Sequence, residues 1–372
     1  MNAPAIGSIS LTQDARWPWV FGGKATEWDA LVLRLGRDPA DLAVLPHVLQ
    51  SFAWGALKDD WGWATTRLVW GPPGAETAVA QLLVRVLAPL PLRVGYCPRG
   101  PLMRADHPGG WPDLLAGLER WARGVGLTWL KMDPDVPAAR NDVLADWRAA
   151  GWMPSPEQIQ FANTMVTALD VHADEAALLA AMKSKTRYNI RLARRREVVV
   201  RHGGADDLPR LFALYAETAE RQGFAIRAEG YYHAAWSAFL AEGRAAVLLA
   251  EHEGQLLAAA LPVRFGDTAW YLYGASSDLE RGRMAPYAVT FEMLRWARAE
   301  GCTRFDWWGG PDHLDEADPM WGVYRFKAGF GAEWVEQLGA WDLELRPLAS
   351  RAYRGLAKMR ASWLARRRQR TA

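Results

Sequence analysis

The chain has 372 residues, of which 50% are hydrophobic and 23% are charged, and its formal net charge is +2. This length is typical of two domains or one large one, and the composition excludes an extended disordered chain. No stretch approaches the roughly 18 consecutive apolar residues of a membrane-spanning helix, and residues 1–14 lack the pattern of a signal peptide, so we expect a cytoplasmic protein.

Hydrophobic periodicity and turn residues predict an alternation of strands and helices along the chain. The first half is expected to contain strands over 63–70 and 79–88, a helix over 111–125, a strand over 128–132 and a helix over 142–150. The second half is expected to contain helices over 174–196, 206–222, 229–242, 286–300 and 322–328, and strands over 245–251, 256–265, 268–274, 303–308 and 333–345. This order of strands and helices resembles the lobe of GNAT N-acetyltransferases, used twice.

An internal repeat supports the doubled lobe. The pattern Arg-Trp-Ala-Arg-x-x-Gly-x-Thr occurs at 120–128 and again at 295–303, and Tyr96 and Tyr271 keep the same spacing upstream. We therefore predict an α/β (α+β) fold of two tandem GNAT-like lobes from an internal duplication. The N-terminal lobe is placed at 1–162, completed by 332–350, and the C-terminal lobe at 163–331. A cleft between two such lobes is where we expect the chemistry.

The C-terminal segment, residues 346–372, has nine basic residues and no acidic one. Apolar residues recur in it at spacings of three and four, which predicts a basic amphipathic helix. Such a helix suits an anionic membrane surface or a nucleic acid. It would equally serve as a solvated helix that covers the N-terminal lobe.

A second basic segment lies within the C-terminal lobe. Seven of the fourteen residues at 183–196 are Lys or Arg, and Tyr188 among them offers a surface on which a base could stack. Cations at this density repel one another, so a polyanionic partner would explain them. A solvated helix face is the alternative interpretation.

Lysine is rare in this chain, which makes the retained lysines informative because a lysine is a compact point charge and an arginine a rigid fork. Lys327 stands between aromatic residues, whereas the repeat places Ala149 at the matching position of the first lobe. A cation beside aromatic rings can stabilise a developing oxyanion, so Lys327 is the candidate catalytic residue. No histidine is flanked by an acid that would make it a convincing general base.

Four sequence motifs together resemble the FemABX family of aminoacyl-tRNA-dependent transferases, which build peptidoglycan cross-bridges. The motifs are Gln-Ser-x-x-Trp-Gly-x-x-Lys ending at Lys58, Tyr-x-Pro-Arg-Gly-Pro from Tyr96, Lys-Thr-Arg-Tyr-Asn-Ile-Arg at 185–191, and Tyr-Arg-Phe-Lys-x-Gly-Phe-Gly at 324–331. The resemblance covers roughly residues 45–345, and it is to the smaller FemX-like members without a coiled-coil arm.

The resemblance implies a role for each candidate position. Lys58 and Arg227 would hold the diphosphate of a UDP- or lipid-linked muropeptide, and Lys327 would assist at the aminoacyl ester. The remaining cleft residues would be Tyr96, Tyr231 and Tyr271. The tRNA-binding residues would be Lys183, Lys185, Arg187, Arg191, Arg194, Arg195 and Phe326.

In one place the chain departs from the family pattern. The family often carries an Asp shortly after the Gly-Pro turn, where this chain reads Leu102-Met103-Arg104. Asp106 is the candidate substitute, and the alternative is that this contact is missing. No metal and no cofactor is expected, because the two cysteines, Cys97 and Cys302, do not form a zinc-type spacing. The expected partners are aminoacyl-tRNA, the muropeptide and the inner face of the cytoplasmic membrane, the last through the basic tail.

Two other functions fit parts of the sequence. An acetyl-CoA-dependent N-acyltransferase would use the GNAT-like lobe, although residues 281–285 match only part of the Gly-rich loop that holds pyrophosphate. A non-catalytic protein that binds tRNA or a membrane surface would use the basic segments alone.

Overall fold

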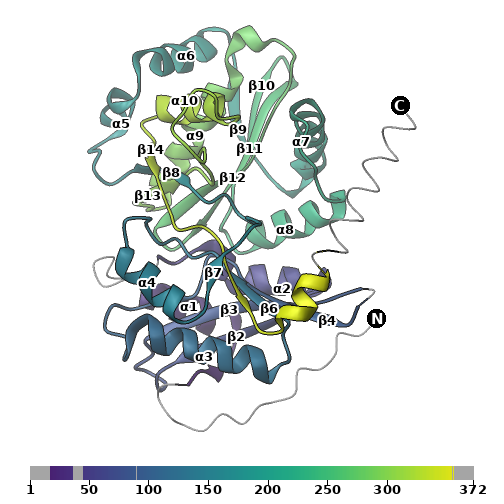
Figure 1. Ribbon diagram of the computed structural model, residues 1–372. Coiled ribbons are helices and arrows are strands. Elements are labelled where there is room, and N and C mark those ends of the chain that lie inside the picture. The colour runs from purple at the N-terminus through teal and green to yellow at the C-terminus, as the bar shows by residue number, and fades with distance from the viewer. Residues whose placement is uncertain (1–16, 37–44, 89, 354, 356–372) are drawn as a thin grey trace. The chain divides into compact units, whose positions relative to one another are not determined.

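The computed structural model describes residues 17–36, 45–88, 90–353 and 355, and the chain divides into two compact units (Figure 1). Unit 1 comprises residues 1–45, 58–158 and 338–372, and unit 2 comprises residues 46–57 and 159–337. Residues 46–57, which lie inside the range expected for the N-terminal lobe, are thus part of unit 2. Within the described chain, no helix has both the length and the apolar character that a bilayer crossing requires.

Unit 1 is built on a sheet in the order β1-β2-β3-β4-β6-β15-β7, with β5 paired to β3. Its strands are β1 (Trp19–Val20), β2 (Ala64–Trp70), β3 (Ala78–Leu87), β4 (Leu92–Cys97), β5 (Leu102–Met103), β6 (Trp129–Met132), β7 (Met153–Pro154) and β15 (Trp341–Glu344). Its helices are α1 (Ala25–Leu35), α3 (Gly110–Gly124) and α4 (Asn141–Ala149), and α2 (Phe52–Asp60) enters it at Lys58.

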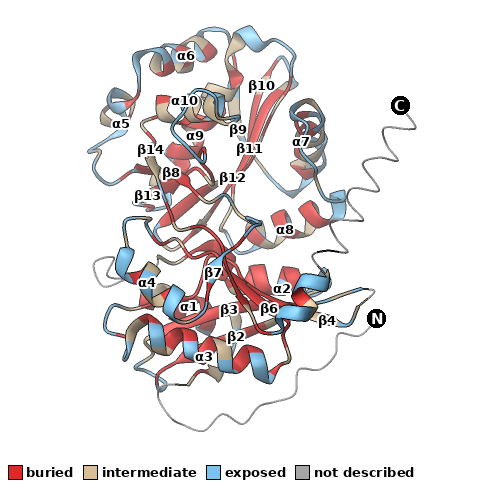
Figure 2. Cartoon of the chain, viewed as in Figure 1, coloured by how far each residue is buried: buried red, intermediate tan, exposed pale blue. Residues whose placement is uncertain are grey.

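Helix α3 illustrates how the sequence pattern forms this unit. Its large apolar residues recur at helical spacing and are buried in the core of unit 1, while Arg120 and Arg123 are exposed. Figure 2 shows the alternation of buried and exposed positions along the helix. The buried residues are Trp111, Leu114, Leu115, Leu118, Trp121 and Ala122. Gly126 then takes a φ of 72°, which allows the chain to turn from α3 into β6.

Unit 2 has a sheet in the order β14-β8-β13-β12-β11-β10-β9. Its strands are β8 (Thr164–Ala168), β9 (Val199–Gly203), β10 (Val247–His252), β11 (Gln255–Phe265), β12 (Thr268–Ser276), β13 (Arg304–Asp306) and β14 (Glu333–Val335). Its helices are α5 (Glu175–Ala181), α6 (Ser184–Arg195), α7 (Leu208–Gln222), α8 (Glu229–Ala241), α9 (Ala285–Ala299) and α10 (Trp321–Gly329), and the short 3₁₀ turn η2 (Val48–Gln50) also belongs to it.

The two units share one arrangement of elements. In unit 1, α3 connects the parallel strands β4 and β6, and in unit 2, α9 connects the parallel strands β12 and β13. The repeated Arg-Trp-Ala-Arg segments lie at the same place, near the ends of α3 and α9.

The units exchange a strand. In unit 1, β15 lies between β6 and β7, although it follows unit 2 in the sequence. In unit 2, β8 occupies the same place between β13 and β14, although it follows β7 of unit 1 in the sequence. After β7 of unit 1 the next strand, β8, therefore joins the sheet of unit 2, and after β14 of unit 2 the next strand, β15, joins the sheet of unit 1.

Two predicted elements are wrong in the same way, because each is really two. The strand expected over 333–345 is divided between β14 in unit 2 and β15 in unit 1, and Gly339 turns the chain between them with a φ of 67°. The helix expected over 174–196 breaks at Met182 and Lys183, which are extended. There the Lys183 amide donates to the carbonyl of Gly329, 2.9 Å away, and this tertiary bond replaces a helical one.

The C-terminal segment is described only at its start. Residues 347–353 are helical, and the rest of the predicted basic amphipathic helix lies outside the described residues, apart from residue 355.

Candidate functional site

Lys327 on α10 is buried, with 7% of its surface exposed. Its Nζ donates to the carbonyl oxygens of Trp307, at 2.8 Å, and Gly309, at 2.7 Å. Burial lowers the pKa of Lys327 to about 8, and the nearby charge of Asp306 opposes that shift. An ammonium has three N–H donors, so one remains beyond the two that hold these carbonyls.

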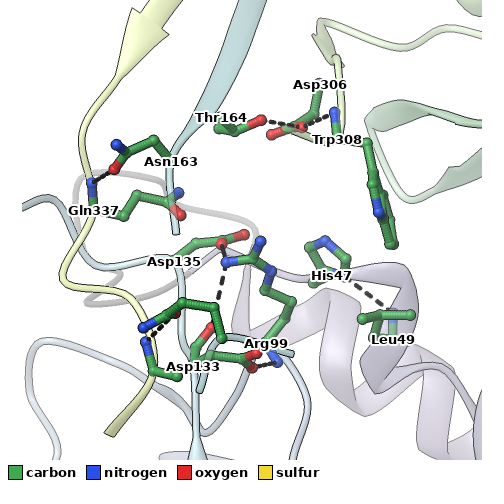
Figure 3. A network of polar contacts seen from close by, with 12 residues as sticks. His47, Leu49, Arg99, Asp133, Asp135, Asn163, Thr164, Asp306, Trp308 and Gln337 are labelled. Atoms are coloured by element: carbon green, nitrogen blue, oxygen red, sulfur yellow. Dashed lines mark hydrogen bonds and ion pairs between the residues drawn. The ribbon is translucent and has the colours of Figure 1, made fainter. Parts of the chain in front are cut away.

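The backbone between those two carbonyls is held in an unusual conformation. Trp308 has a φ of 67°, which a bulky side chain rarely adopts. Its amide donates to Oδ1 of Asp306 at 2.8 Å, and the same carboxylate oxygen accepts the hydroxyl of Thr164 at 2.7 Å (Figure 3). Asp306 from β13 and Lys327 from α10 thus fix the turn from both sides.

Trp308 is a half-buried residue, and its ring packs on that of His47. Figure 3 shows the two rings side by side, and their centroids are 5.5 Å apart. The centroid of the His47 ring also lies 4.8 Å from that of Trp270. Nδ1 of His47 accepts the amide of Leu49 at 3.1 Å, which fixes the imidazole in this position. His47 and Trp308 were not among the residues predicted from the sequence, where the Trp-Trp-Gly-Gly run after β13 was the available signal.

All three residues of β13 pair with the beginning of β12. The pairing covers Thr268–Trp270 of the nine-residue β12, and the rest of β12 extends past the end of β13. Tyr271 follows at this point, and its ring lies edge-on to Trp307 with centroids 5.9 Å apart. Burial raises the pKa of the Tyr271 hydroxyl.

Phe326 joins the same aromatic cluster. Its ring lies 5.2 Å from that of Tyr287 and 5.1 Å from that of Phe330, and Phe330 in turn contacts Trp307 at 5.7 Å. Of the predicted residues, Lys327 and Tyr271 therefore contact the 307–309 turn directly, and Phe326 is connected to it through Phe330.

Helix α6 presents the predicted basic face. Five cations of this segment are exposed, namely Lys183 at the N-terminal cap and Lys185, Arg191, Arg194 and Arg195 along the helix. Within the described chain, none of these five forms an ion pair. Thr186, Asn189 and Ala193 face inward. Tyr188 is 54% exposed, and the guanidinium of Arg195 lies 5.5 Å from its ring centroid.

Arg187 differs from the other cations of α6. Its guanidinium donates to the carbonyl of Ala180 at 3.1 Å and to that of Met182, so it closes the C-terminal end of α5. Arg187 was predicted to bind tRNA, and in the structure its guanidinium makes contacts inside unit 2.

Arg227 and Tyr231 lie together at the start of α8. The exposed guanidinium of Arg227 stands over the ring of Tyr231, with its Cζ 4.8 Å from the centroid. Tyr231 is buried, and desolvation raises the pKa of its hydroxyl to about 12. This pair leaves a supported cation at the surface of unit 2.

In unit 1, Tyr96 belongs to a buried polar network. Its hydroxyl donates to Oδ2 of Asp133 at 2.7 Å, and the amide of Arg99 donates to Oδ1 at 2.7 Å. The guanidinium of Arg99 pairs with Asp135 at 2.8 Å (Figure 3). Desolvation raises the pKa of Asp133 to about 6, and Arg99 opposes the shift.

Lys58 and Asp106 complete the predicted positions in unit 1. Lys58 on α2 is buried, with 7% of its surface exposed. Asp106, the candidate substitute for the Asp of the family pattern, is exposed and pairs with Arg104 at 2.7 Å.

The comparisons with known proteins agree with this fold. A sequence profile of the FemAB family matches residues 146–253 and 250–358. The lipid II:glycine glycyltransferase of Staphylococcus aureus (strain USA300) is 25% identical, over 80% of this chain and 88% of that protein.

Solved structures give the same result for the fold. The crystal structure of FemX superposes with a TM-score of 0.79 at 23% identity, and covers 90% of this chain and 99% of that one. A tandem GNAT protein from the clavulanic acid biosynthesis pathway gives a TM-score of 0.52 at 17% identity, and covers 87% and 97% of the two chains. The predicted tandem GNAT-like fold is therefore confirmed. Since the family profile spans more than half of the sequence, this chain belongs to the FemAB family.

Proposed function

We propose that this protein transfers an amino acid from aminoacyl-tRNA to a side-chain amine of the stem peptide of a lipid- or UDP-linked peptidoglycan precursor. The observation that carries the proposal is the match over 80% of the chain to a relative named lipid II:glycine glycyltransferase. Family membership and the FemX-like fold are in agreement with it.

The basic face of α6 supports a tRNA donor. Five exposed cations without an acidic partner in the described chain form one surface, and the phosphates of a nucleic acid would neutralise their mutual repulsion. The exposed ring of Tyr188 would add a stacking contact. Arg187 would contribute indirectly, by keeping α5 and α6 in place.

The precursor would be held by its phosphates. Arg227 is exposed and supported by the Tyr231 ring, which suits it to a diphosphate. We assign Lys58 to the same substrate on the family resemblance. Tyr96 donates its hydroxyl proton to Asp133, so toward the precursor its phenolic oxygen would serve as an acceptor.

The reaction converts an ester into an amide. The nitrogen of the stem-peptide amine attacks the ester carbonyl carbon, the bond between that carbon and the ribose oxygen breaks, and the amine proton passes to the ribose oxygen. A lysine-like amine has a pKa of about 10.4, so only about one in 10³ is neutral at pH 7, a cost of roughly 4–5 kcal/mol. The free N–H of Lys327 would stabilise the oxyanion of the intermediate.

The alternative of an acetyl-CoA-dependent acyltransferase is less favoured by the turn before α9. There Arg281 pairs with Asp278 and Arg283 pairs with Glu280, so carboxylates stand where a pyrophosphate would bind. Arg196 in addition donates to the carbonyl of Gly282. Calorimetric titration with acetyl-CoA separates the two functions, and tight binding would favour the acyltransferase.

The main test is a transfer assay. The full chain is incubated with a pool of charged tRNAs and both precursor forms, and the product is identified by mass spectrometry. We expect a mass increase of one amino acid residue on one or both precursors, and none when the tRNAs are uncharged. Binding of tRNA without transfer would instead support the non-catalytic alternative.

We also propose that the protein acts in the cytoplasm, in peripheral contact with the membrane. The nine basic residues of 346–372 would bind anionic lipid. Co-sedimentation with vesicles of anionic and of zwitterionic lipid tests this, and equal binding to both would contradict it.

A further inference from the structure

We propose that Trp308 is the platform on which the terminal nucleoside ring of the donor stacks. The inference rests on the proposed function and assigns a binding residue in unit 2 to the terminal nucleoside of the aminoacyl-tRNA. Three observations carry it: the strained backbone of Trp308, the packing of its ring while the residue keeps part of its surface exposed, and its place between the two carbonyls that Lys327 binds.

The strain is held from several directions. The φ of Trp308 is 67°, a region that glycine adopts freely, and the next two residues are glycines, yet an indole occupies the position. The Trp308 amide bonds to Asp306, and the carbonyls of its two neighbours, Trp307 and Gly309, both accept from Lys327. A conformation that costs energy and is determined by this many bonds is characteristic of functional sites.

The Trp308 ring packs against the imidazole of His47. His47 lies between Trp308 and Trp270, with ring centroids 5.5 Å and 4.8 Å away, and is fixed by its bond from the Leu49 amide. Because Trp308 keeps part of its surface exposed while its backbone and ring are fixed, it can offer a preorganised face to a planar ligand.

The place of Trp308 indicates which ligand stacks on it. It lies between the two carbonyls that Lys327 holds, so the indole and the free N–H of that ammonium belong to one rigid turn. In an aminoacyl-tRNA, the ester and the terminal base are attached to the same ribose. A group that contacts the ester oxygen and an aromatic face fixed beside it would therefore contact two parts of one nucleotide.

The test compares three substitutions at this position. Trp308→Phe keeps an aromatic face, Trp308→Ala removes it and keeps the strain, and Trp308→Gly removes both. Glu253→Gly is the matched control, because Glu253 has a φ of 48° in the exposed turn between β10 and β11. Thermal unfolding should show Trp308→Gly to be more stable than Trp308→Ala, the reverse of the usual order, if the backbone is strained.

Binding is measured by calorimetry with two probes. One is an RNA minihelix that ends in CCA and carries an amide-linked amino acid, and the other is uridine diphosphate. Trp308→Gly and Trp308→Ala should bind the minihelix about 10- to 100-fold more weakly, while Trp308→Phe stays within a few-fold of the unsubstituted protein. Binding of uridine diphosphate should be unchanged in all three, and Glu253→Gly should bind both probes normally.

The outcomes separate the platform from the function. If the unsubstituted protein binds the minihelix and Trp308→Gly binds it equally well, the platform is wrong and the proposed function stands. Weakened binding of uridine diphosphate alone would place Trp308 at the precursor and overturn the inference. If the unsubstituted protein neither binds the minihelix nor transfers an amino acid, the proposed function itself fails.

Discussion

Lys327 donates a hydrogen bond from its buried Nζ to the carbonyl oxygen of Trp307, 2.8 Å away, and so connects α10 to the end of β13. The same ammonium also bonds to Gly309. One lysine thereby links the fold of unit 2 to the proposed chemistry, since the cation that shapes the turn is also the candidate for oxyanion stabilisation.

Replacing this lysine should affect both stability and transfer. Lys327→Met leaves two carbonyls without their buried donor, which we expect to cost about 2–4 kcal/mol of unfolding free energy. Single-turnover transfer should fall by about 10²-fold or more. Denaturant unfolding and rapid-quench assays measure the two effects, with Lys24→Met, at an exposed lysine of unit 1, as control. Transfer within about twofold of the unsubstituted rate would remove Lys327 from the mechanism.

The pH dependence of transfer should report the lowered pKa of Lys327, which is about 8. Below pH 8 the ammonium is charged and the rate should rise about tenfold per pH unit, because the acceptor amine deprotonates with a pKa of about 10.4. Above pH 8 the ammonium loses its charge, so the rise should level off. Short reaction times corrected for spontaneous ester hydrolysis give this profile, and a rise that continues unbroken to pH 10 would contradict the role of the charge.

The cations of α6 should differ in their contribution to tRNA binding. Arg191→Ala removes an exposed cation, so affinity should fall and the slope of log K against log salt should decrease by about 0.7–0.9. Arg187→Ala removes the bonds to Ala180 and Met182, so it should lower thermal stability with little change in that slope. Titrations at several salt concentrations test the pair, and an equal effect of both on the slope would contradict the assignment.

Asp133 should make the stability of unit 1 depend on pH. Its folded-state pKa, about 6, is above the ordinary value of 3.8, so the folded protein binds this proton more readily than the unfolded chain. Its contribution to stability is therefore complete below pH 4 and declines as the pH rises through 6, by about 3 kcal/mol. Asp133→Asn cannot titrate, and its stability relative to the unsubstituted protein should increase between pH 4 and 7. A constant difference over this range would show that burial does not shift this carboxyl.

The strand exchange predicts that unit 1 depends on the end of the chain. Removal of residues 338–372 takes away β15, whose Trp341 and Leu343 are buried in the unit 1 core and whose backbone bonds β6 and β7. We expect the truncated chain to lose the protease resistance of residues 58–158. Truncation after residue 355, which keeps β15, is the control and should leave that resistance intact.

The two halves of the chain were predictable in outline because local signals and packing agree there. The apolar spacing in α3 and α9 and the repeated Arg-Trp-Ala-Arg segment predict an amphipathic helix between two strands, and the structure contains it twice. The basic face of α6 was also visible, since charge needs no partner to be read from a sequence.

The doubled α/β fold and the identity of the rare cations could be read from the amino-acid pattern. The burial of Lys327, the contact of Arg187 with the end of α5, and the division of residues 333–345 between two sheets became evident only in the folded chain. Folding also brought His47 to Trp308, which lies 261 positions later in the sequence. Periodicity reflects contacts between neighbours along the chain, whereas burial, strain and strand exchange depend on segments that meet only when the chain folds.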